Sequence, residues 1–541
     1  MAQPNPGPSG GPAQPGLAHD RDLAQPRTAE PALHRWWTLT AVCLGTFMLL
    51  LDITIVNVAL PAIQKDLNST FSDLQWVVDA YALTLAASLL TSGSVADMYG
   101  RRRLYLIGLA LFTVASLLCG VATDTLFLQL SRGLQGVGGA IMFAVSLALL
   151  ADAFRGKDRG IAFGVWGAIT GLAVAIGPLV GGALTSGLSW RWIFFVNLPI
   201  GAGAIVITIR QVHESRDPHP RRPDWIGFAT FTAALAFLVF ALIESGEKGF
   251  TDSLVLGCFA AAAVLLVAFL TAELTGRHPM FDLGLFRKPT FSGGLIAAFG
   301  LSASIFSMLL YLTIYLQDVL GYSPFATGLR LLTISGGILV VAAIAGRLSS
   351  IVPVRLLIGP GLILVAVSLL LLRGLDASSS WTHLVPGFVL GGIGVGLINP
   401  PLASTAVGVV EPSRAGMASG INSTFRQVGI ATGIALLGSL FASRVHTAAA
   451  SAFSAVPGLG DRAHQVGAAL TNGQLGNTLA KLPPSLRAPI ADAARAAFTS
   501  GLNDILLVAA VIALLAGVLA LVLIRTKDFV GHQPATDMAA A

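Results

Sequence analysis

The sequence predicts an all-α polytopic membrane protein in which fourteen membrane-spanning helices form two six-helix bundles with two further helices inserted between them. The prediction rests on the composition, the number of long apolar segments and an internal repeat. The chain has 541 residues, of which 54% are hydrophobic and only 11% are charged, and its mean hydropathy is +0.77. This composition excludes a soluble globular domain.

Fourteen apolar segments are long enough to cross a bilayer, because about twenty apolar residues cover its hydrocarbon core. The expected spans are 36–60, 75–96, 104–122, 126–151, 161–186, 192–210, 225–243, 253–273, 291–317, 326–346, 353–372, 383–406, 415–441 and 503–524. We expect the first to sixth spans to build an N-terminal bundle over 35–210. The C-terminal bundle covers 291–524, and the inserted pair lies with its loops in 211–290.

Three further segments lie outside the expected spans. Residues 1–34 are rich in Pro, Gly and Ala and lack apolar periodicity, so we expect a disordered, uncleaved tail there. Residues 525–541 form a second tail. The Ala-rich segment 442–502 is long for a loop, and a short amphipathic helix is one expectation for it.

Basic residues are retained on the cytoplasmic side of a membrane, so their distribution predicts the orientation. With the N-terminus inside, the cytoplasmic segments hold 21 Lys and Arg residues and the outside loops hold 9. Both termini are therefore expected in the cytoplasm, with the chain a multi-pass protein of the plasma membrane and its lipid bilayer. The abundance of Ala and Gly suggests a bacterium. No basic face with interleaved aromatic residues indicates nucleic-acid binding.

An internal repeat appears at a spacing of 256 residues. Gly136 and Gly138 correspond to Gly392 and Gly394, and the segment 160–164 corresponds to 416–420. The same spacing pairs spans one to six with spans nine to fourteen and leaves spans seven and eight unmatched. Two related halves are typical of transporters.

Asp52 lies inside the first apolar segment, where an ionised carboxylate costs about 2.5 to 3.5 kcal/mol. Burial favours the protonated form of a carboxyl and a neighbouring cation favours the ionised form. The chemistry that suits such a residue is uptake and release of a proton, so protons are an expected partner.

Several motifs resemble those of the major facilitator superfamily and its fourteen-helix drug/proton antiporter branch, which together cover nearly all of the membrane part. Residues 93–103 (GSVADMYGRRR) resemble the superfamily's signature loop between spans two and three. The stretch around Asp52 is similar to the branch's first-helix motif, and residues 190–201 (WRWIFFVNLPIG) to its hallmark at span six. Aromatic residues in the latter also suit an interfacial belt.

The resemblance implies a cytoplasmic gate at the signature loop, formed by Gly93, Asp97, Gly100, Arg101 and Arg102. In the family the aspartate caps a helix N-terminus and pairs with an arginine. Three arginines would also serve as a simple positive-inside anchor. The second-half counterpart, 346–355, has Ser350 in place of Asp97, so we predict an asymmetric pair of gates.

Two arginines and a second carboxylate lie within spans. Arg132 stands in residues 130–139 (LSRGLQGVGG), where the resemblance implies a role in proton coupling, and a structural ion pair or a snorkelling residue is the alternative. Asp79 is a further proton-coupling candidate or a polar cap near the interface. Arg426, in the late-helix motif 422–429, is the fourth candidate; Asp52, Asp79 or Glu411 could each be its partner.

Span five carries glycines and a proline that resemble the antiporter signature of the superfamily: Gly171, Gly177, Pro178, Gly181 and Gly182. Such residues allow a bend and close helix packing, so one half could rock against the other, although plain packing would use the same residues. The antiport direction is implied by the resemblance alone.

These observations predict a monomeric transporter that exchanges inward-moving protons for outward-moving hydrophobic or cationic organic molecules. A dedicated exporter of one endogenous metabolite, antibiotic or lipid is the alternative, and a non-transporting membrane sensor is a remote one. No enzyme activity, cofactor or metal is expected, because the histidines form no HExxH spacing and the chain has no GxxxxGK[ST] segment. The substrate-binding residues are not identified.

Overall fold

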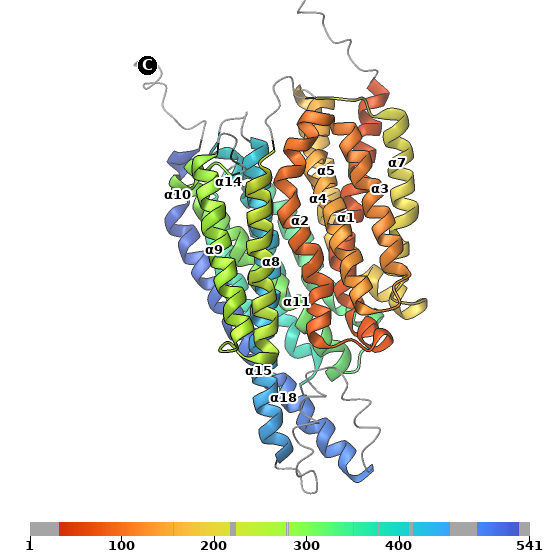
Figure 1. The fold of residues 1–541 in the computed structure, drawn as a ribbon, viewed down its shortest axis with the longest axis vertical. Helices are drawn as coiled ribbons and strands as arrows, with labels where there is room; N and C mark the ends of the chain where they lie inside the picture. Colours follow the sequence, from red (N-terminus) through yellow and green to blue (C-terminus); the bar gives the residue numbers. More distant parts are fainter. Residues whose placement is uncertain are drawn as a thin grey trace, which may run out of the picture.

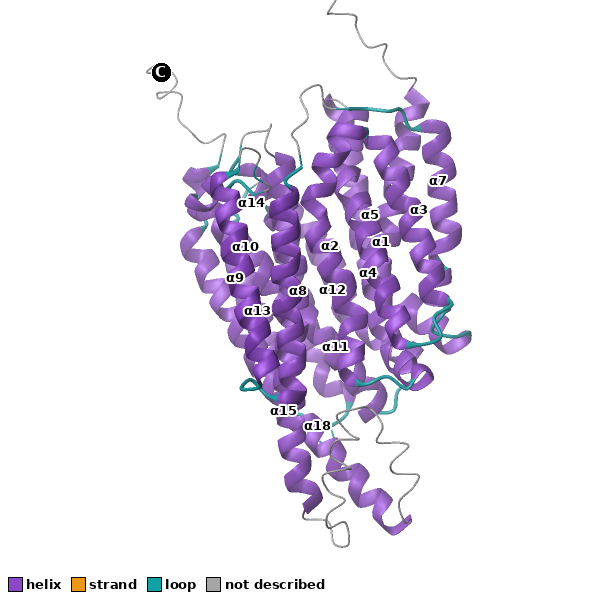
Figure 2. Ribbon diagram, viewed as in Figure 1, coloured by secondary structure: helices purple, strands orange, loops and turns teal. Residues whose placement is uncertain are grey.

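The computed structural model describes residues 32–154, 156–216, 223–276, 279, 281–349, 351–376, 379–410, 415–454 and 484–529. Every regular element in these ranges is a helix (Figure 2). Helices suit apolar segments in a bilayer because they satisfy their backbone groups within the segment itself. The predicted all-α membrane fold is confirmed.

The N-terminal half contains six spans, the last of which is divided between two helices. Its elements are α1 (Ala32–Leu67), α2 (Phe71–Tyr99), α3 (Arg101–Gly120), α4 (Thr125–Ala153), α5 (Gly156–Gly187), α6 (Trp192–Phe195) and α7 (Asn197–Gln211). The inserted pair follows as α8 (Trp225–Lys248) and α9 (Ser253–Thr275).

The C-terminal half begins after a short 3-10 helix, η1 (Leu283–Arg287). Its first span is interrupted by two π-helical segments, which are common at functional sites. The elements are α10 (Pro289–Leu301), η2 (Ser302–Phe306), α11 (Ser307–Ile314), η3 (Tyr315–Val319), α12 (Pro324–Leu348), α13 (Arg355–Leu371), η4 (Trp381–Leu384), α14 (Val385–Gly408), α15 (Ala415–Ser454), α18 (Pro484–Leu523) and η6 (Thr526–Asp528).

The helices match the fourteen predicted spans. Within the described ranges, 13 helices are long and apolar enough to cross a membrane. The shorter apolar helix α13 occupies the eleventh predicted span. Its 17 residues extend about 26 Å at 1.5 Å per residue, slightly less than a typical hydrocarbon core.

The spans run side by side along the long axis of the molecule (Figure 1). The described chain begins and ends at the same end of this bundle, here called the near end, and the turn between α1 and α2 lies at the opposite, far end. The inserted helix α8 packs against both halves. Its apolar residues share one buried cluster with residues of α2 in the N-terminal half and of α15 in the C-terminal half.

Equivalent glycines make equivalent contacts in the two halves. Gly136 of α4 lies against the backbone of Tyr81 in α2, and Gly392 of α14 lies against Gly337 in α12. Gly136 and Gly392 are 256 residues apart, and so are their partners Tyr81 and Gly337. The repeat found in the sequence therefore corresponds to the same helix packing.

The segment 442–502, for which a loop or a short amphipathic helix was expected, is helical at both ends. Helix α15 continues to Ser454 and α18 already begins at Pro484, so both helices extend beyond the bundle at the far end (Figure 1). Alanine favours helix, and the two extensions pack together, with the rings of Phe441 and Phe498 4.9 Å apart. Residues 455–483 lie outside the described ranges.

Candidate functional site

Asp52 and Arg132 form an ion pair in the interior of the N-terminal half. Arg132 Nη1 donates to Asp52 Oδ2 at 2.5 Å, and the two side chains are 1% and 0% exposed. Arg132 Nε also donates to the carbonyl oxygen of Val77 at 3.1 Å, and its guanidinium lies 4.2 Å from the ring centroid of Tyr81. The sequence left a structural pair and proton coupling open, and this geometry is compatible with both.

Three neutral side chains complete the hydrogen bonding of this pair. Asp52 Oδ1 accepts from Gln135 Nε2 at 2.8 Å and from Asn197 Nδ2 at 3.0 Å. Both amides also donate to Ser116 Oγ, at 2.7 and 3.1 Å. The Asp52 centre, defined as Asp52, Ser116, Arg132, Gln135 and Asn197, thus joins four helices. A buried ion pair is tolerated when its remaining hydrogen-bonding capacity is met in this way.

Ser116, Gln135 and Asn197 were not predicted from the sequence as site residues. The signal was present for two of them, because Gln135 and Asn197 are polar residues at membrane depth inside the motifs 130–139 and 190–201. Close helix packing brings them together: a Cβ on Gly138 of α4 would overlap the backbone of Phe112 in α3. Ser116 lies in an ordinary apolar helix, and nothing in its sequence context marks it.

Asp79 is buried in a different setting. Its side chain is fully buried, and neither carboxyl oxygen has a hydrogen-bond partner among the described residues. An ionised carboxylate without a donor or a cation is strongly unfavourable in an apolar interior, so this environment suits the neutral acid. The interpretation of Asp79 as an interfacial polar cap does not fit, since its carboxyl oxygens accept no hydrogen bond within the described chain.

Arg426 remains without a partner in the part of the chain that the structure describes. Asp52 is occupied by Arg132, and Asp79 is unpaired. Glu411, the third candidate partner, lies outside the described residues. The side chain of Arg426 is half-buried on α15.

At the near end, Asp97 and Arg101 pair as the signature-loop motif predicts. Arg101 Nε and Nη2 both donate to Asp97 Oδ1, at 3.0 and 2.9 Å. Gly100 between them has φ +112°, a conformation that favours glycine. A Cβ added to Gly93 would have no neighbour within 4 Å, so close packing does not explain that residue.

The helix cap expected from Asp97 is supplied by another residue. Glu214, in the segment after α7, accepts from the backbone N–H groups of Arg102 and Arg103 at 3.0 and 3.2 Å. Asp97 cannot serve there because it lies at the end of the preceding helix and is held by Arg101. Arg102 reaches the last turn of α7, where its Nη2 donates to the carbonyl oxygen of Ile209 at 2.5 Å. The signature loop therefore ties α2, α3 and α7 together.

The span-five residues lie in two tight interfaces. A Cβ on Gly177 would overlap Thr54, and one on Gly181 would overlap the carbonyl oxygen of Ile55, so these two glycines let α5 approach α1. Gly182 and Pro178 face the other half, where they touch Pro324 and Gly328 of α12. Gly171 is less tightly packed, because a Cβ added there would lie 3.5 Å from Leu339 of α12.

The two halves are closed against each other at the far end. Gln317 Nε2 of η3 donates to the carbonyl oxygen of Val58 in α1 at 2.7 Å. Lys65 and Asp318 form an ion pair across the same boundary at 3.5 Å. Further along, the backbone N–H of Phe325 donates to Ser186 Oγ at 2.9 Å.

Toward the near end, one glycine on α5 and one on α12 have free space beside them. A Cβ added to Gly164 of α5 or to Gly346 of α12 would meet no atom within 4 Å. Both positions continue the helix faces that meet at Pro178 and Gly328, because residues three or four apart share a face. The halves are thus in close contact at the far end, whereas α5 and α12 have free space beside these two near-end positions.

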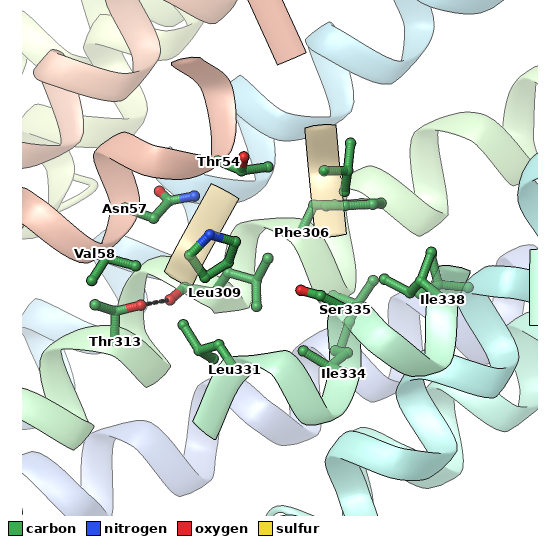
Figure 3. A pocket seen from close by; sticks show the side chains of 14 residues that line it. Thr54, Asn57, Val58, Phe306, Leu309, Thr313, Leu331, Ile334, Ser335 and Ile338 are labelled. Atoms are coloured by element: carbon green, nitrogen blue, oxygen red, sulfur yellow. Dashed lines mark hydrogen bonds between the residues drawn. The ribbon is translucent and has the colours of Figure 1, made fainter. Parts of the chain in front are cut away.

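A small apolar cavity lies where the halves meet. Its volume is about 30 Å³, and its lining includes Thr54, Asn57, Phe306, Leu309 and Ser335 (Figure 3). A pocket for a drug-sized molecule measures about 300 to 1,000 Å³, so this cavity does not hold one in the present conformation. Asp52 is absent from its lining and points instead into the N-terminal half.

The motif at span six fixes the end of α1. Trp190 Nε1 and Arg191 Nη1 both donate to Asp66 Oδ2, at 2.9 and 2.6 Å. Trp190 is 3% exposed, so this tryptophan does not act as an interfacial anchor. Trp192 is exposed and fits the belt.

Comparisons with known proteins agree with this architecture. Residues 42–434 match a family model described as Major Facilitator Superfamily. The multidrug resistance protein Stp of Mycobacterium tuberculosis is 40% identical over 407 residues, which cover 75% of this chain and 76% of that protein. The puromycin resistance protein pur8 of Streptomyces alboniger is 36% identical over 415 residues, covering 76% of this chain and 82% of that protein.

Among solved structures, the fold is similar to a bacterial homolog of the human lysosomal transporter Spinster in an inward-facing and occupied conformation. The TM-score is 0.64 at 17% sequence identity, over 93% of this chain and 100% of that chain. At this identity the likeness concerns the fold alone.

Proposed function

This chain belongs to the Major Facilitator Superfamily, and from that premise we propose that it exports small organic molecules in exchange for protons across a bacterial plasma membrane. Its near end would be cytoplasmic, as the excess of Lys and Arg in the segments at that end indicates. Names of relatives, such as multidrug resistance protein and drug efflux pump, support the class of cargo. A family of transporters argues against an enzyme and against the sensor alternative.

The observation that carries the proposal is the Asp52 centre. Asp52 is the one carboxylate in the described interior that is held by a guanidinium and two amide donors. Protonation of Asp52 would remove the charge that holds Arg132, and release of the proton would restore it. Because the centre joins α1, α3, α4 and α7, a change in its charge would alter how these helices pack.

The helix pair α5 and α12 supports the second half of the mechanism, alternating access. Contacts at Gly182 and Gly328 close the far end, while Gly164 and Gly346 toward the near end have free space beside them. Rocking about these contacts would exchange the open and closed ends. One chain carries both halves, so the proposal needs no second subunit, and we propose a monomer as the working unit.

A dedicated exporter remains the second candidate, favoured by two relatives. A tetracenomycin C resistance and export protein of Streptomyces glaucescens is 34% identical over 417 residues, and a probable actinorhodin transporter of Streptomyces coelicolor is 34% identical over 424 residues. Both proteins are named for a single product. A panel of structurally unrelated dyes and antibiotics separates the candidates, because a dedicated exporter would move one chemical class only.

The proposal is tested in liposomes that contain wild type or Asp52→Asn. A pH gradient is imposed, and a fluorescent cationic dye is followed together with the lumenal pH. We expect Asp52→Asn to lose gradient-driven dye movement but to keep dye exchange at equal pH, which shows that the variant is folded. Proton-linked movement that survives intact in Asp52→Asn would place the proton site elsewhere.

A further inference from the structure

A second hollow lies at the far end, away from the central cavity. Its volume is about 580 Å³. It is lined by the first turns of α2 (Ser72, Gln75), the end of the inserted helix α8 (Lys248) and the outer part of α15 (Gly438, Ser443, His446). Lys248, Ser443 and His446 are exposed, so the hollow has a polar rim open to the far side.

The floor of the hollow is a hydrogen-bonded plug. Gln75 is 3% exposed, and its Nε2 donates to the carbonyl oxygen of Ile434 at 3.0 Å and to Tyr311 Oη at 3.5 Å. Tyr311 Oη donates to the same carbonyl oxygen at 2.7 Å. Gly438 allows this arrangement, because a Cβ there would overlap the amide nitrogen of Gln75. The plug therefore bridges α2, α11 and α15, which belong to different halves.

Directly beyond the plug lies Asp79, the buried carboxyl without a partner in the described chain. It follows Gln75 by four residues on α2 and therefore shares its helix face. Asp79 is also close enough to Tyr311 for the two side chains to interact electrostatically. About one helical turn thus separates an unpaired carboxyl from Gln75, which lines the hollow that faces the far side.

We propose that this hollow is the entrance through which protons from the far side reach Asp79, and that the Gln75 amide is its plug. The step is transfer of a proton from a hydronium ion in the hollow to the Asp79 carboxylate, which gives water and the carboxylic acid. This inference rests on the proposed proton-coupled function. It assigns the inserted helix α8 a role, since α8 supplies one wall of the entrance.

The charged and titratable groups around the route are few. On α8, Lys248 is held by Glu244 at 2.8 Å. On α15, His446 stands at the rim. On α11, Tyr311 forms part of the plug. Asp52 is paired with Arg132 within the N-terminal half, so Asp79 is the carboxyl without a cation beyond the plug in the described residues.

The first experiment removes the plug. Proteoliposomes with wild type, Gln75→Ala or Gln75→Ala/Asp79→Asn receive an imposed membrane potential without any organic substrate, and a lumenal dye reports proton flux. We expect Gln75→Ala to raise the passive proton flux severalfold and the double variant to return to the wild-type flux. Dye exchange at equal pH confirms that each variant is folded.

Two outcomes would overturn the inference. A Gln75→Ala protein that exchanges dye normally but shows no added proton flux would mean that the amide is no plug. Flux that persists in the double variant would mean that the route bypasses Asp79. Neither outcome touches the proposed function, which fails instead if the wild type shows no proton-linked dye movement.

The second experiment fills the hollow. Ser72→Cys, at the entrance, and Ser253→Cys, an exposed far-end residue of α9 outside the hollow, are labelled with a bulky thiol reagent before reconstitution. The parent protein receives the same treatment, because its Cys43, Cys119 and Cys258 are buried. We expect the label on Ser72→Cys to slow gradient-driven transport severalfold and to leave dye exchange at equal pH unchanged. Equal loss of both activities would overturn the inference and favour an organic ligand in the hollow.

Discussion

Gly182 of α5 lies so close to α12 that a Cβ on it would overlap the carbonyl oxygen of Pro324. One turn earlier, the backbone of Pro178 touches Gly328 in the same way. The two helices belong to different halves. Because each contact involves a glycine, their closest approach is a contact between backbones. Closure at the far end thus depends on the absence of side chains.

Gly182→Leu should therefore hold the far end open, because the closed state cannot accommodate the side chain without moving backbone. We expect a large loss of transport with little change in thermal stability. The distance between spin labels at the far ends of α5 and α12 should lengthen in this variant. Gly187→Leu is the matched control, since Gly187 is also on α5 but a Cβ added to it would have no neighbour within 4 Å. An unchanged distance in Gly182→Leu would contradict the closure mechanism.

The Asp52 centre allows a double-mutant test of stability. Arg132→Met removes the cation and leaves Asp52 buried with an uncompensated charge, which costs about 3 to 5 kcal/mol for a buried pair. Adding Asp52→Asn removes that charge, so the double variant should recover part of the loss. Thermal unfolding in detergent at constant pH measures both. A double variant less stable than Arg132→Met alone would show that the pair does not act as a unit.

The span count and the helix type could be predicted from the sequence because long apolar segments in lipid have few alternatives to helix. Asp52 and Arg132 were each predicted as proton-coupling residues, but their pairing was not predicted, and the structure places the two in contact. Their supporting residues were less predictable, because Ser116 is recognised only by what packs against it. Three-dimensional proximity between α3, α4 and α7 is not encoded in any local pattern.

Two other features could not be predicted from the local sequence, for physical reasons. The cap on α3 comes from Glu214, more than a hundred residues away from the motif that was expected to supply it. For the alanine-rich segment 442–502 the sequence left a loop or a short amphipathic helix open, and residues such as Ile490 and Ala494 are buried on one face of α18. Helix propensity and pairing with a partner decided the structure there, where hydropathy gave a weak signal.

Asp66 makes two interactions whose contributions to stability can be compared. It accepts a hydrogen bond from the buried indole of Trp190, and it forms a partly exposed ion pair with Arg191. Asp66→Ala leaves the buried indole N–H of Trp190 without an acceptor, which costs about 1 to 3 kcal/mol. Arg191→Ala removes a half-exposed ion pair worth about 0 to 1 kcal/mol, together with one hydrogen bond to the carbonyl oxygen of Ala122 and the contact with the Trp190 ring. Denaturation in detergent should therefore rank Asp66→Ala as the less stable variant. The reverse order would mean that Arg191, and not Trp190, fixes the end of α1.

The near-end gate gives the last prediction. Asp97 accepts two hydrogen bonds from Arg101, whereas its repeat counterpart, Ser350, has no charge and lies outside the described residues. Asp97→Asn weakens a charge-assisted contact that joins the end of α2 to the start of α3. We expect Asp97→Asn to reduce the initial rate of gradient-driven transport well below that of Ser350→Ala, with both proteins reconstituted at equal amounts. Arg103→Ala serves as a control for charge alone, because the Arg103 side chain is mostly exposed and 3.7 Å from its partner Glu214. Equal losses of transport in Asp97→Asn and Ser350→Ala would show that both loops gate alike. A loss in Arg103→Ala as large as that in Asp97→Asn would mean that the motif serves only as a positive-inside anchor.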